Sequence, residues 1–383
     1  MDSCDVIVIG AGSIGVPLAM NLVEKGMRTV VIDRNASCGQ GDNKHAIGGI
    51  RATHSDPAKI LVCKRSLEIF SSWEAKRGDD IEWQKGGYTF VAFRESDERA
   101  LRSILPIQKS FGLSIDYVGP DKIADLVPGI NSEGLLGGTH SIEDGSASPL
   151  LSSNAFYRAA LGAGADFRFR ENVRSVLVER GAAVGVSTDK DTYLAPVVVD
   201  AAGALSPEIA RTAGTDVQVL PDSHEGAITE PVKQFFSTML VDMRPAPGSK
   251  NYYFYQNRHG QIVFCITPDP PILGTDRRET SIFLPQVARR MVQLLPRLKN
   301  IRVRRVWRGL YPMTPDGSPF VGWNRSVKGL LHMTGMCGQG FMLGPGLGEV
   351  GARLVEGKSM MDDRTVLEGF DPYRAAKAQE SLK

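Results

Sequence analysis

Three glycines near the start of the chain have the spacing that binds the phosphates of a dinucleotide. Gly10, Gly12 and Gly15 form G-x-G-x-x-G. The first allows a tight turn, the second lets a pyrophosphate approach bare backbone, and the third lets a helix pack close to a strand. Asp33 follows where a carboxylate can accept hydrogen bonds from ribose hydroxyls, and the adjacent Arg34 joins the candidate cofactor site.

The residues around this motif predict the elements that it needs. Residues 6–9 are an apolar, β-branched run typical of a parallel strand buried on both faces. Residues 16–25 predict a helix whose N-terminal amides point at the phosphates, and residues 29–32 predict the second strand. A strand, the glycines, a helix and an acid in this order are far more specific than a glycine triplet alone, so we predict a dinucleotide site.

The next run, residues 39–54, comes directly after Asp33, so it must cross the cofactor beyond its pyrophosphate. Its small residues permit backbone contact with a flat ring, and Arg51 would lie near the reacting face. A surface ion pair is an equal alternative for Arg51. The candidate cofactor residues in this run are His45, Ala46, Gly48 and Gly49.

Two later segments favour FAD over a nicotinamide cofactor. Residues 197–204 read as a strand that enters a glycine turn, followed by a helix over 205–214, and residues 167–173 read as a strand whose backbone could hold an adenine. A plain packing unit is the alternative, but such a segment after a βαβ unit suits a flavin. The candidates here are Val173, Ala202 and Gly203.

Residues 334–349 place many glycines before a helix predicted over 347–356. A helix start offers unpaired N–H groups and a partial positive charge, which would stabilise the negative charge of a reduced flavin. A glycine-rich helix cap is the alternative. The candidates are Gly338, Gly340, Phe341 and Met342.

Length and composition restrict the class of protein. A chain of 383 residues with 42% hydrophobic and 23% charged residues is typical of a globular enzyme of about two domains. A net charge of +2 argues against nucleic acid as a partner. We find no apolar run long enough for a membrane span and no signal peptide. The five scattered cysteines suit neither a disulfide framework nor a metal site, and favour a reducing cytoplasm.

Alternating patterns at 235–241, 252–256 and 262–266 indicate an antiparallel sheet with one exposed face. We therefore predict an α/β fold (α+β overall), with a Rossmann-type FAD-binding domain assembled from discontinuous segments and an inserted antiparallel-sheet substrate domain. The FAD-binding domain is assigned to residues 1–80, 141–222 and 308–383, and the substrate domain to residues 81–140 and 223–307.

With Asp144-Gly, Thr229-Glu-Pro and the run TPDGSPFVG at 314–322, these segments resemble the D-amino-acid-oxidase superfamily of FAD enzymes. The closer likeness is to its branch of sarcosine oxidase, dimethylglycine dehydrogenase and dye-linked L-proline dehydrogenase. The resemblance spans nearly the whole chain. It implies extended FAD and oxidation of a C–N bond by hydride transfer to flavin N5. It also implies that Arg51 holds the substrate carboxylate, helped by Tyr253, for which an ordinary strand aromatic is the alternative.

Departures from the family pattern favour a dehydrogenase over an oxidase. Monomeric sarcosine oxidase carries Gly-His-Gly-Phe-Lys where this chain has residues 338–342 as Gly-Gln-Gly-Phe-Met. Its flavin-tethering cysteine would fall at Gly309, and its oxygen-activating lysine near Phe264. Residues 44–48 resemble the dimethylglycine dehydrogenase segment whose histidine bonds to the flavin, so a covalent bond through His45 is an alternative that we do not favour.

Three functions follow. The first is FAD-dependent oxidation of a small secondary or N-methylated amino acid, with oxygen or a redox carrier as electron acceptor. The second is oxidation of a 2-hydroxy acid or glycerol phosphate, with His54 as base; His54 is also the candidate active-site hydrogen-bonding residue for the first. The third is a flavin-bearing subunit or assembly factor that acts through a protein partner, because the branch includes hetero-oligomers. The other histidines, His224 among them, read as surface or satisfied core residues with no metal-ligand spacing.

Overall fold

A computed structural model describes residues 4–376. Six of its strands form one sheet in the order β18-β19-β12-β1-β2-β8, with β1 near the centre. All neighbours in it are parallel except β18 and β19. The strands are β1 (Val6–Ile9), β2 (Thr29–Asp33), β8 (Asp166–Phe169), β12 (Val197–Asp200), β18 (Phe320–Trp323) and β19 (Leu330–Thr334). The predicted strands over 6–9 and 29–32 are confirmed.

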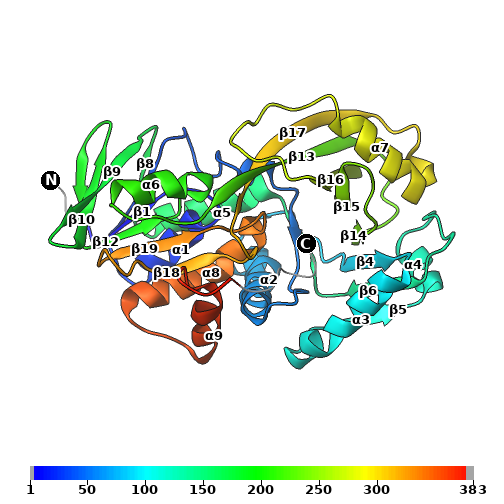
Figure 1. Ribbon diagram of the computed structural model, residues 1–383, viewed down its shortest axis with the longest axis horizontal. Coiled ribbons are helices and arrows are strands. Elements are labelled where there is room, and N and C mark those ends of the chain that lie inside the picture. Colours follow the sequence, from blue (N-terminus) through cyan, green and yellow to red (C-terminus); the bar gives the residue numbers. More distant parts are fainter. Residues whose placement is uncertain (1–3, 377–383) are drawn as a thin grey trace.

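Both faces of this sheet are covered, which is why its strands are apolar throughout. Val6 and Val8 belong to the core shared with the helices on one face, whereas Ile7 and Ile9 belong to the core on the other face (Figure 1). The first face carries α1 (Gly15–Glu24), α2 (Pro57–Arg77), α5 (Pro149–Gly162), α8 (Gly340–Glu356) and α9 (Met361–Phe370). The second carries β9 (Val173–Glu179), β10 (Ala182–Thr188), β11 (Thr192–Leu194) and α6 (Ser206–Thr212).

Eight further strands form the second large sheet, in the order β17-β13-β16-β15-β14-β4-β6-β5. Its neighbours are antiparallel except β14 and β4. Its strands are β4 (Tyr88–Ala92), β5 (Ile115–Val118), β6 (Gly137–Ser141), β13 (Leu220–Pro231), β14 (Met239–Asp242), β15 (Ser249–Gln256), β16 (Gln261–Pro268) and β17 (Val303–Met313).

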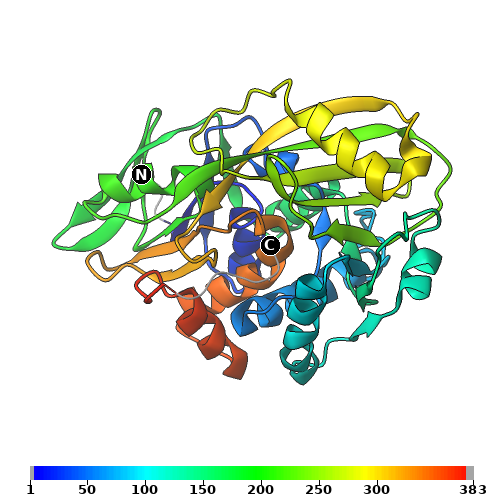
Figure 2. The ribbon, with the colours of Figure 1, turned by 45° about the vertical axis from the view of Figure 1, so that its right-hand side comes forward.

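Helix α7 (Phe283–Leu294) covers the outer face of this second sheet (Figure 2). Tyr252, Phe254 and Phe264 are fully buried in the core that contains α7. The alternate residues of the same strands face inward. Further elements are α3 (Glu95–Ser110), α4 (Pro120–Leu126), η1 (Asn43–His45), η2 (Gly203–Leu205), η3 (Pro296–Leu298), β3 (Gly49–Ile50) and β7 (Gly145–Ser146).

The prediction that a helix starts at residue 347 was wrong. Helix α8 begins at Gly340 because the following glycines form a contact face. A Cβ on Gly348 would lie 2.8 Å from the Pro17 carbonyl carbon of α1, and one on Gly346 would lie 2.4 Å from the Val62 carbonyl oxygen of α2. The glycines that we read as a loop therefore let α8 lie directly against α1 and α2.

Other differences are smaller. Residues 167–173 are two strands, β8 and β9, rather than one. The pattern at 235–241 becomes a strand only from Met239. Strand β13 begins at Leu220, before the predicted segment limit at 222, and strand β17 ends at Met313, after the predicted limit at 308. The second sheet therefore extends past both limits. The domain division itself stays a prediction.

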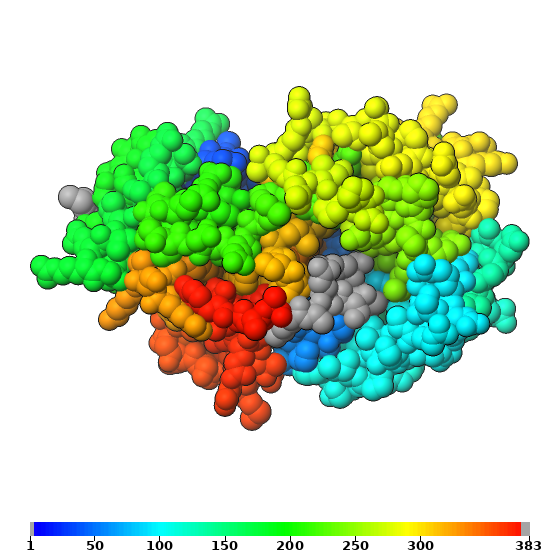
Figure 3. Space-filling view, in the orientation of Figure 1, coloured from blue at the N-terminus to red at the C-terminus, as the bar shows by residue number. Residues whose placement is uncertain are grey.

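In the space-filling view the green, orange and red segments of the first sheet and its helices lie on one side (Figure 3). The yellow and cyan segments of the second sheet lie on the other side. Within residues 4–376, no helix combines the length and the apolar character that crossing a bilayer requires. All five cysteines are free thiols. The cytoplasmic location stays a prediction.

Candidate active site

A cavity of about 460 Å³ is lined by residues of both large sheets and of the segments between them. It receives the ends of β1, β2 and β12 on one side and the inward faces of β13, β15, β16 and β17 on the other. All predicted cofactor residues line this cavity except Gly15. Of the three predicted catalytic residues, Arg51 and Tyr253 line it and His54 does not.

The three motif glycines have separate structural reasons. Gly10 adopts φ +108°, and a Cβ there would lie 2.6 Å from the Ala201 carbonyl oxygen. Gly12 lines the cavity, and a Cβ there would meet no atom within 4 Å, so the space beside it is open. Gly15 faces the sheet instead, since its Cβ would lie 1.9 Å from the Gly10 oxygen. Gly12 is thus the glycine that leaves room for a phosphate.

Asp33 lies beside this loop at the end of β2. One carboxylate oxygen accepts a 2.8 Å hydrogen bond from the Ala11 N–H, and the other accepts one of 2.7 Å from the Asn35 N–H. The Asn35 side-chain amide also donates to the second oxygen, Oδ1, at 2.9 Å, so Oδ2 is the oxygen that keeps an acceptor site for a ribose hydroxyl. Val173 and Gly203, with open space at its Cβ position, line the same end of the cavity. This end suits the adenosine part of FAD.

The segment after Asp33 crosses the cavity and is held by the second sheet. Tyr255 donates a 2.7 Å hydrogen bond from its hydroxyl to the Ile47 carbonyl, and Trp307 donates a 2.8 Å bond from its indole to the His45 carbonyl. Gly48 adopts φ +95°, and a Cβ there would lie 2.4 Å from the Ala147 oxygen. Close backbone contacts therefore fix this stretch where a flat ring would lie.

The two positions at which related enzymes tether their flavin lie side by side. A Cβ on Gly309 would lie 2.6 Å from the His45 Cβ. The His45 Nδ1 is buried and has no hydrogen-bond partner among the residues described. Burial lowers the pKa of His45 to about 4, so its imidazole is neutral at physiological pH. This geometry suits packing of His45 against the edge of a flavin.

The N-terminus of α8 faces the cavity and carries no acidic side chain in its first turn. Its unpaired N–H groups suit the negative charge of a reduced flavin, as the sequence predicts. The preceding residues are tightly constrained: Cys337 adopts φ +50° without being glycine, and Gly338 adopts φ +81°. A Cβ on Gly338 would lie 2.1 Å from the Tyr311 ring, so this ring packs against bare backbone.

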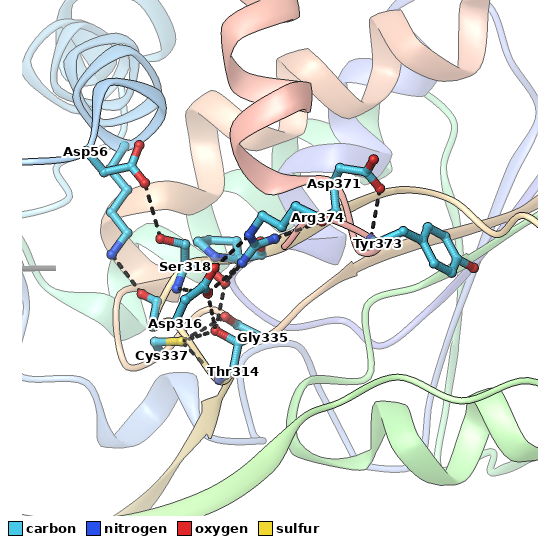
Figure 4. A network of polar contacts seen from close by, with 12 residues as sticks. Asp56, Thr314, Asp316, Ser318, Gly335, Cys337, Asp371, Tyr373 and Arg374 are labelled. Atoms are coloured by element: carbon cyan, nitrogen blue, oxygen red, sulfur yellow. Dashed lines mark hydrogen bonds and ion pairs between the residues drawn. The ribbon is translucent and has the colours of Figure 1, made fainter. Parts of the chain in front are cut away.

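A polar network holds this loop from behind (Figure 4). The Cys337 Sγ lies 3.4 Å from the Thr314 Oγ1, and Thr314 donates a 2.8 Å hydrogen bond to the Ser318 carbonyl. Asp316 in the same turn pairs with Arg374 at 2.7 Å, and the Arg374 side chain is 6% exposed. The C-terminal segment thereby fixes the turn that supports Cys337.

Arg51 is 4% exposed and lines the cavity. Its Cζ lies 5.6 Å from the ring centroid of Tyr88 and 5.2 Å from that of Phe90, and its guanidinium donates to the Thr53 carbonyl. Below it, Asp144 accepts hydrogen bonds from the Ala52 N–H at 3.0 Å and the Thr53 hydroxyl at 3.1 Å. Burial raises the pKa of Asp144 to about 6. The surface ion pair considered for Arg51 is therefore excluded.

The prediction for His54 was wrong. Its side chain is fully buried, its Nε2 lies 3.4 Å from the Cys63 Sγ, and it does not line the cavity. Burial first, and the nearby Arg51 cation second, hold the pKa of His54 well below its usual range. Although His54 is only three residues beyond Arg51, its side chain lies in the core beside α2. Proximity in the sequence does not predict this.

The lysine position predicted near Phe264 falls on β16. Phe264 packs in the core with α7, whereas its neighbour Cys265 lines the cavity. The β16 side chain nearest the predicted lysine position is therefore the Cys265 thiol. Burial raises the pKa of Cys265 to about 12, so this thiol is neutral.

Sequence reasoning missed several cavity residues of the second sheet. The inward side chains are Asp222 and His224 of β13, Cys265 of β16 and Tyr311 of β17. Only Cys265 had an available signal, because the alternation predicted over 262–266 places it on the face opposite Phe264. Within the described part of the chain, no group of three or more His, Cys, Asp or Glu side chains is arranged to hold a metal ion.

Comparison with known proteins agrees with this geometry. The family model described as FAD dependent oxidoreductase matches residues 5–354. Glycine oxidase of Bacillus licheniformis is 26% identical over 367 residues, covering 92% of this chain and 93% of that protein. Mitochondrial dimethylglycine dehydrogenase of Mus musculus is 24% identical, and the match covers 91% of this chain but 42% of that longer protein.

Among solved structures, L-proline dehydrogenase from P. horikoshii superposes with a TM-score of 0.91 at 28% identity, covering 97% of this chain and 98% of that one. These relatives fit the branch that the sequence motifs indicate. The glycine turns, the Asp33 carboxylate and the open N-terminus of α8 suit FAD along one cavity. The chain therefore belongs to the FAD-dependent oxidoreductase family of the D-amino-acid-oxidase type.

Proposed function

We propose that this protein oxidises the C–N bond of a small secondary or N-methylated amino acid. The observation that carries the proposal is a buried arginine, Arg51, that lines the same cavity as Tyr253 of the second sheet. FAD, when bound, accepts the hydride and so supplies the oxidation. Relatives named for glycine, dimethylglycine and L-proline support a small amino acid as substrate.

The chain's own residues bind and orient the substrate in this proposal. The Arg51 guanidinium would donate two hydrogen bonds to the substrate carboxylate, which fixes the amine with respect to the cofactor. The rings of Tyr88 and Phe90 flank that guanidinium and exclude water, which strengthens its attraction for an anion. Tyr253 would donate a further hydrogen bond to the same carboxylate.

The proposal specifies a dehydrogenase that passes electrons to a carrier. The residues that correspond to the two lysines of monomeric sarcosine oxidase are Met342 and the Phe264–Cys265 pair, none of which is a cation. A cation beside the flavin would stabilise the charge that develops on oxygen. We expect reoxidation by a quinone or dye to be faster than reoxidation by oxygen, and we expect FAD to be released by acid, without a bond to His45.

The second candidate function, oxidation of a 2-hydroxy acid or glycerol phosphate, required His54 as base. His54 lies outside the cavity and cannot take that role. The decisive experiment follows the visible spectrum of the purified flavoprotein without oxygen while sarcosine, dimethylglycine, L-proline, glycine, lactate or glycerol 3-phosphate is added. Loss of the flavin absorption band with sarcosine, dimethylglycine or L-proline would support the proposal, whereas loss with glycine alone would place the substrate among primary amines and contradict it. Loss with lactate or glycerol 3-phosphate alone would contradict it.

A further inference from the structure

An acid and a histidine of β13 line the same cavity as Arg51 and have no role in the proposed function so far. Asp222 and His224 are two residues apart, so both side chains project from the same face of the strand. The His224 Nε2 lies 3.2 Å from the Asp222 Oδ2, and both residues are 6% exposed. The second Asp222 oxygen accepts a 2.8 Å hydrogen bond from the Ile272 N–H.

Asp222 is ionised in this arrangement. Burial alone would raise its pKa, but the hydrogen bond and charge of His224, with the Ile272 and Ser223 N–H groups, hold the pKa of Asp222 below its usual value. Both Asp222 oxygens have a hydrogen-bond partner, one in His224 and the other in the Ile272 N–H. The imidazole of His224 is held in one plane as a result.

The imidazole stacks on Tyr311. The two ring centroids lie 3.7 Å apart at an interplanar angle of 13°. In the register of β13 and β17, Tyr311 pairs with Asp222, and Gly309 pairs with His224, where the missing side chain leaves room. The Tyr311 ring also packs against Gly338, as described above, so it is confined between the imidazole and the glycine backbone.

Tyr311 in turn meets Tyr253. Their hydroxyl oxygens lie 3.1 Å apart, and both residues line the cavity. When one phenol donates to the other, one O–H of the pair remains to donate elsewhere. That remaining donor suits a carboxylate oxygen.

We propose that Asp222 and His224 are positioning residues that hold Tyr311, and through it Tyr253, in the pose that receives the substrate carboxylate. This inference rests on the proposed function. A purely structural role explains the pair less well, because the His224 Nδ1 is buried with no hydrogen-bond partner among the described residues. An orphaned buried nitrogen lowers stability, and an apolar ring would fill the same space without that cost.

The test compares three variants of the flavoprotein. His224→Phe keeps a ring against Tyr311 but loses the bond to Asp222, His224→Ala loses both, and Asp222→Asn keeps an oxygen that can accept from the imidazole. His259→Ala is the matched control, because His259 forms a similar 2.7 Å pair with Glu82 and does not line the cavity. Melting temperatures of all variants establish that they are folded.

Pyrrole-2-carboxylate is the probe, because it is a planar carboxylate without an oxidisable Cα–H, and its binding can be followed by the flavin spectrum. We expect the dissociation constant to rise about 100-fold in His224→Ala and about tenfold in His224→Phe, as for loss of hydrogen bonds to a charged group. Asp222→Asn should raise the dissociation constant about tenfold, because its single amide oxygen can accept from only one of the two donors that Asp222 accepts from, and His259→Ala should be unchanged.

Wild-type affinity in both His224 variants would overturn the inference, and so would failure of the probe to bind the wild-type protein. The proposed function is judged separately, by reduction of the flavin with amines. If the probe binds and the His224 variants weaken it while no amine reduces the flavin, the positioning role stands and the proposed function fails. If an amine reduces the flavin and the variants bind normally, only the positioning role fails.

Discussion

The two halves of the cavity are built by different means. The half at the first sheet is mainly backbone: Gly10, Gly12, Gly48 and the N-terminus of α8 leave space or present N–H groups. The half at the second sheet consists of side chains on strands that are distant in sequence, such as Tyr253 and Tyr311.

This difference corresponds to a division of function. A cofactor common to a whole family can be bound by backbone, whose geometry does not depend on the particular side chains. A substrate must be recognised by charge and hydrogen bonding at specific points, which side chains supply. Mutations should therefore separate the two halves, so that some remove flavin without affecting the fold and others weaken substrate without affecting flavin.

The largest effect is expected at Gly12. A valine there should fold normally, because a Cβ meets no atom within 4 Å, but it would occupy the space of the pyrophosphate. We expect almost complete loss of flavin, and with it of activity, with little change in the melting temperature of the apoprotein. Gly119→Val is the control, since the Cβ position of Gly119 is equally open and lies outside the cavity.

Gly15→Ala should instead reduce the yield of folded protein, because a Cβ on Gly15 would lie 1.9 Å from the Gly10 carbonyl oxygen. Normal flavin content in Gly12→Val would show that the backbone half is assigned to the wrong place.

The next effect is expected at Arg51. Lysine keeps the charge but loses the two-pronged donor geometry, so the kcat/KM for the reducing amine should fall about 100-fold. Flavin content should stay within about 20% of the wild type, as the comparison between the halves requires. Arg99→Lys, on the exposed surface of α3, serves as control. Parallel loss of flavin and activity would show that Arg51 supports the cofactor rather than the substrate.

The same contrast explains what could be predicted from the sequence. The first strand, the glycine turn and Asp33 are local, because all contacts that define them lie within about one βαβ unit. The two strands of this unit could therefore be predicted, and the cofactor residues chosen from the sequence, apart from Gly15, line the cavity. The start of α8 could not, because glycines within a helix are justified only by contact with α1 and α2, which are far away in the sequence.

For the side-chain half, alternation predicted the antiparallel sheet and the run over 39–54 placed Arg51 near the reacting face, but only the family likeness indicated that Arg51 and Tyr253 hold a carboxylate. His224 and Tyr311 acquire their role from the antiparallel pairing of β13 with β17, a register that no short motif encodes. His54 shows the opposite failure. Its proximity to Arg51 in the sequence suggested a shared site, yet its imidazole lies in the core beside Cys63.

A third prediction concerns the buried acid beneath Arg51. Because the pKa of Asp144 is raised from 3.8 to about 6, the folded state binds its proton more tightly than the unfolded state. Its contribution to stability is present below pH 4 and is lost as pH rises through about 6, by up to about 3 kcal/mol. Asp144→Asn cannot titrate, so the wild-type free energy of unfolding should fall relative to this variant between pH 4 and 7. Denaturant titrations at several pH values measure this difference. If the free energies of unfolding of the wild type and Asp144→Asn depended on pH in the same way, the Arg51 charge would fully offset the cost of burying the Asp144 carboxylate.

The smallest effect is expected at Arg277, whose side chain pairs with Asp42 in the segment that follows β2. Arg277 forms two 3.0 Å bonds with Asp42, and the Asp42 Oδ1 also accepts from the Leu310 N–H at 3.0 Å. Because the Arg277 side chain is 33% exposed, we expect Arg277→Gln to weaken FAD binding by only about three- to fivefold. Arg278→Gln, which breaks the neighbouring exposed pair with Asp276, should leave FAD binding unchanged. Flavin loss in Arg277→Gln as complete as in Gly12→Val would mean that side chains hold the cofactor as strongly as the backbone does, and the division between the two halves would not hold.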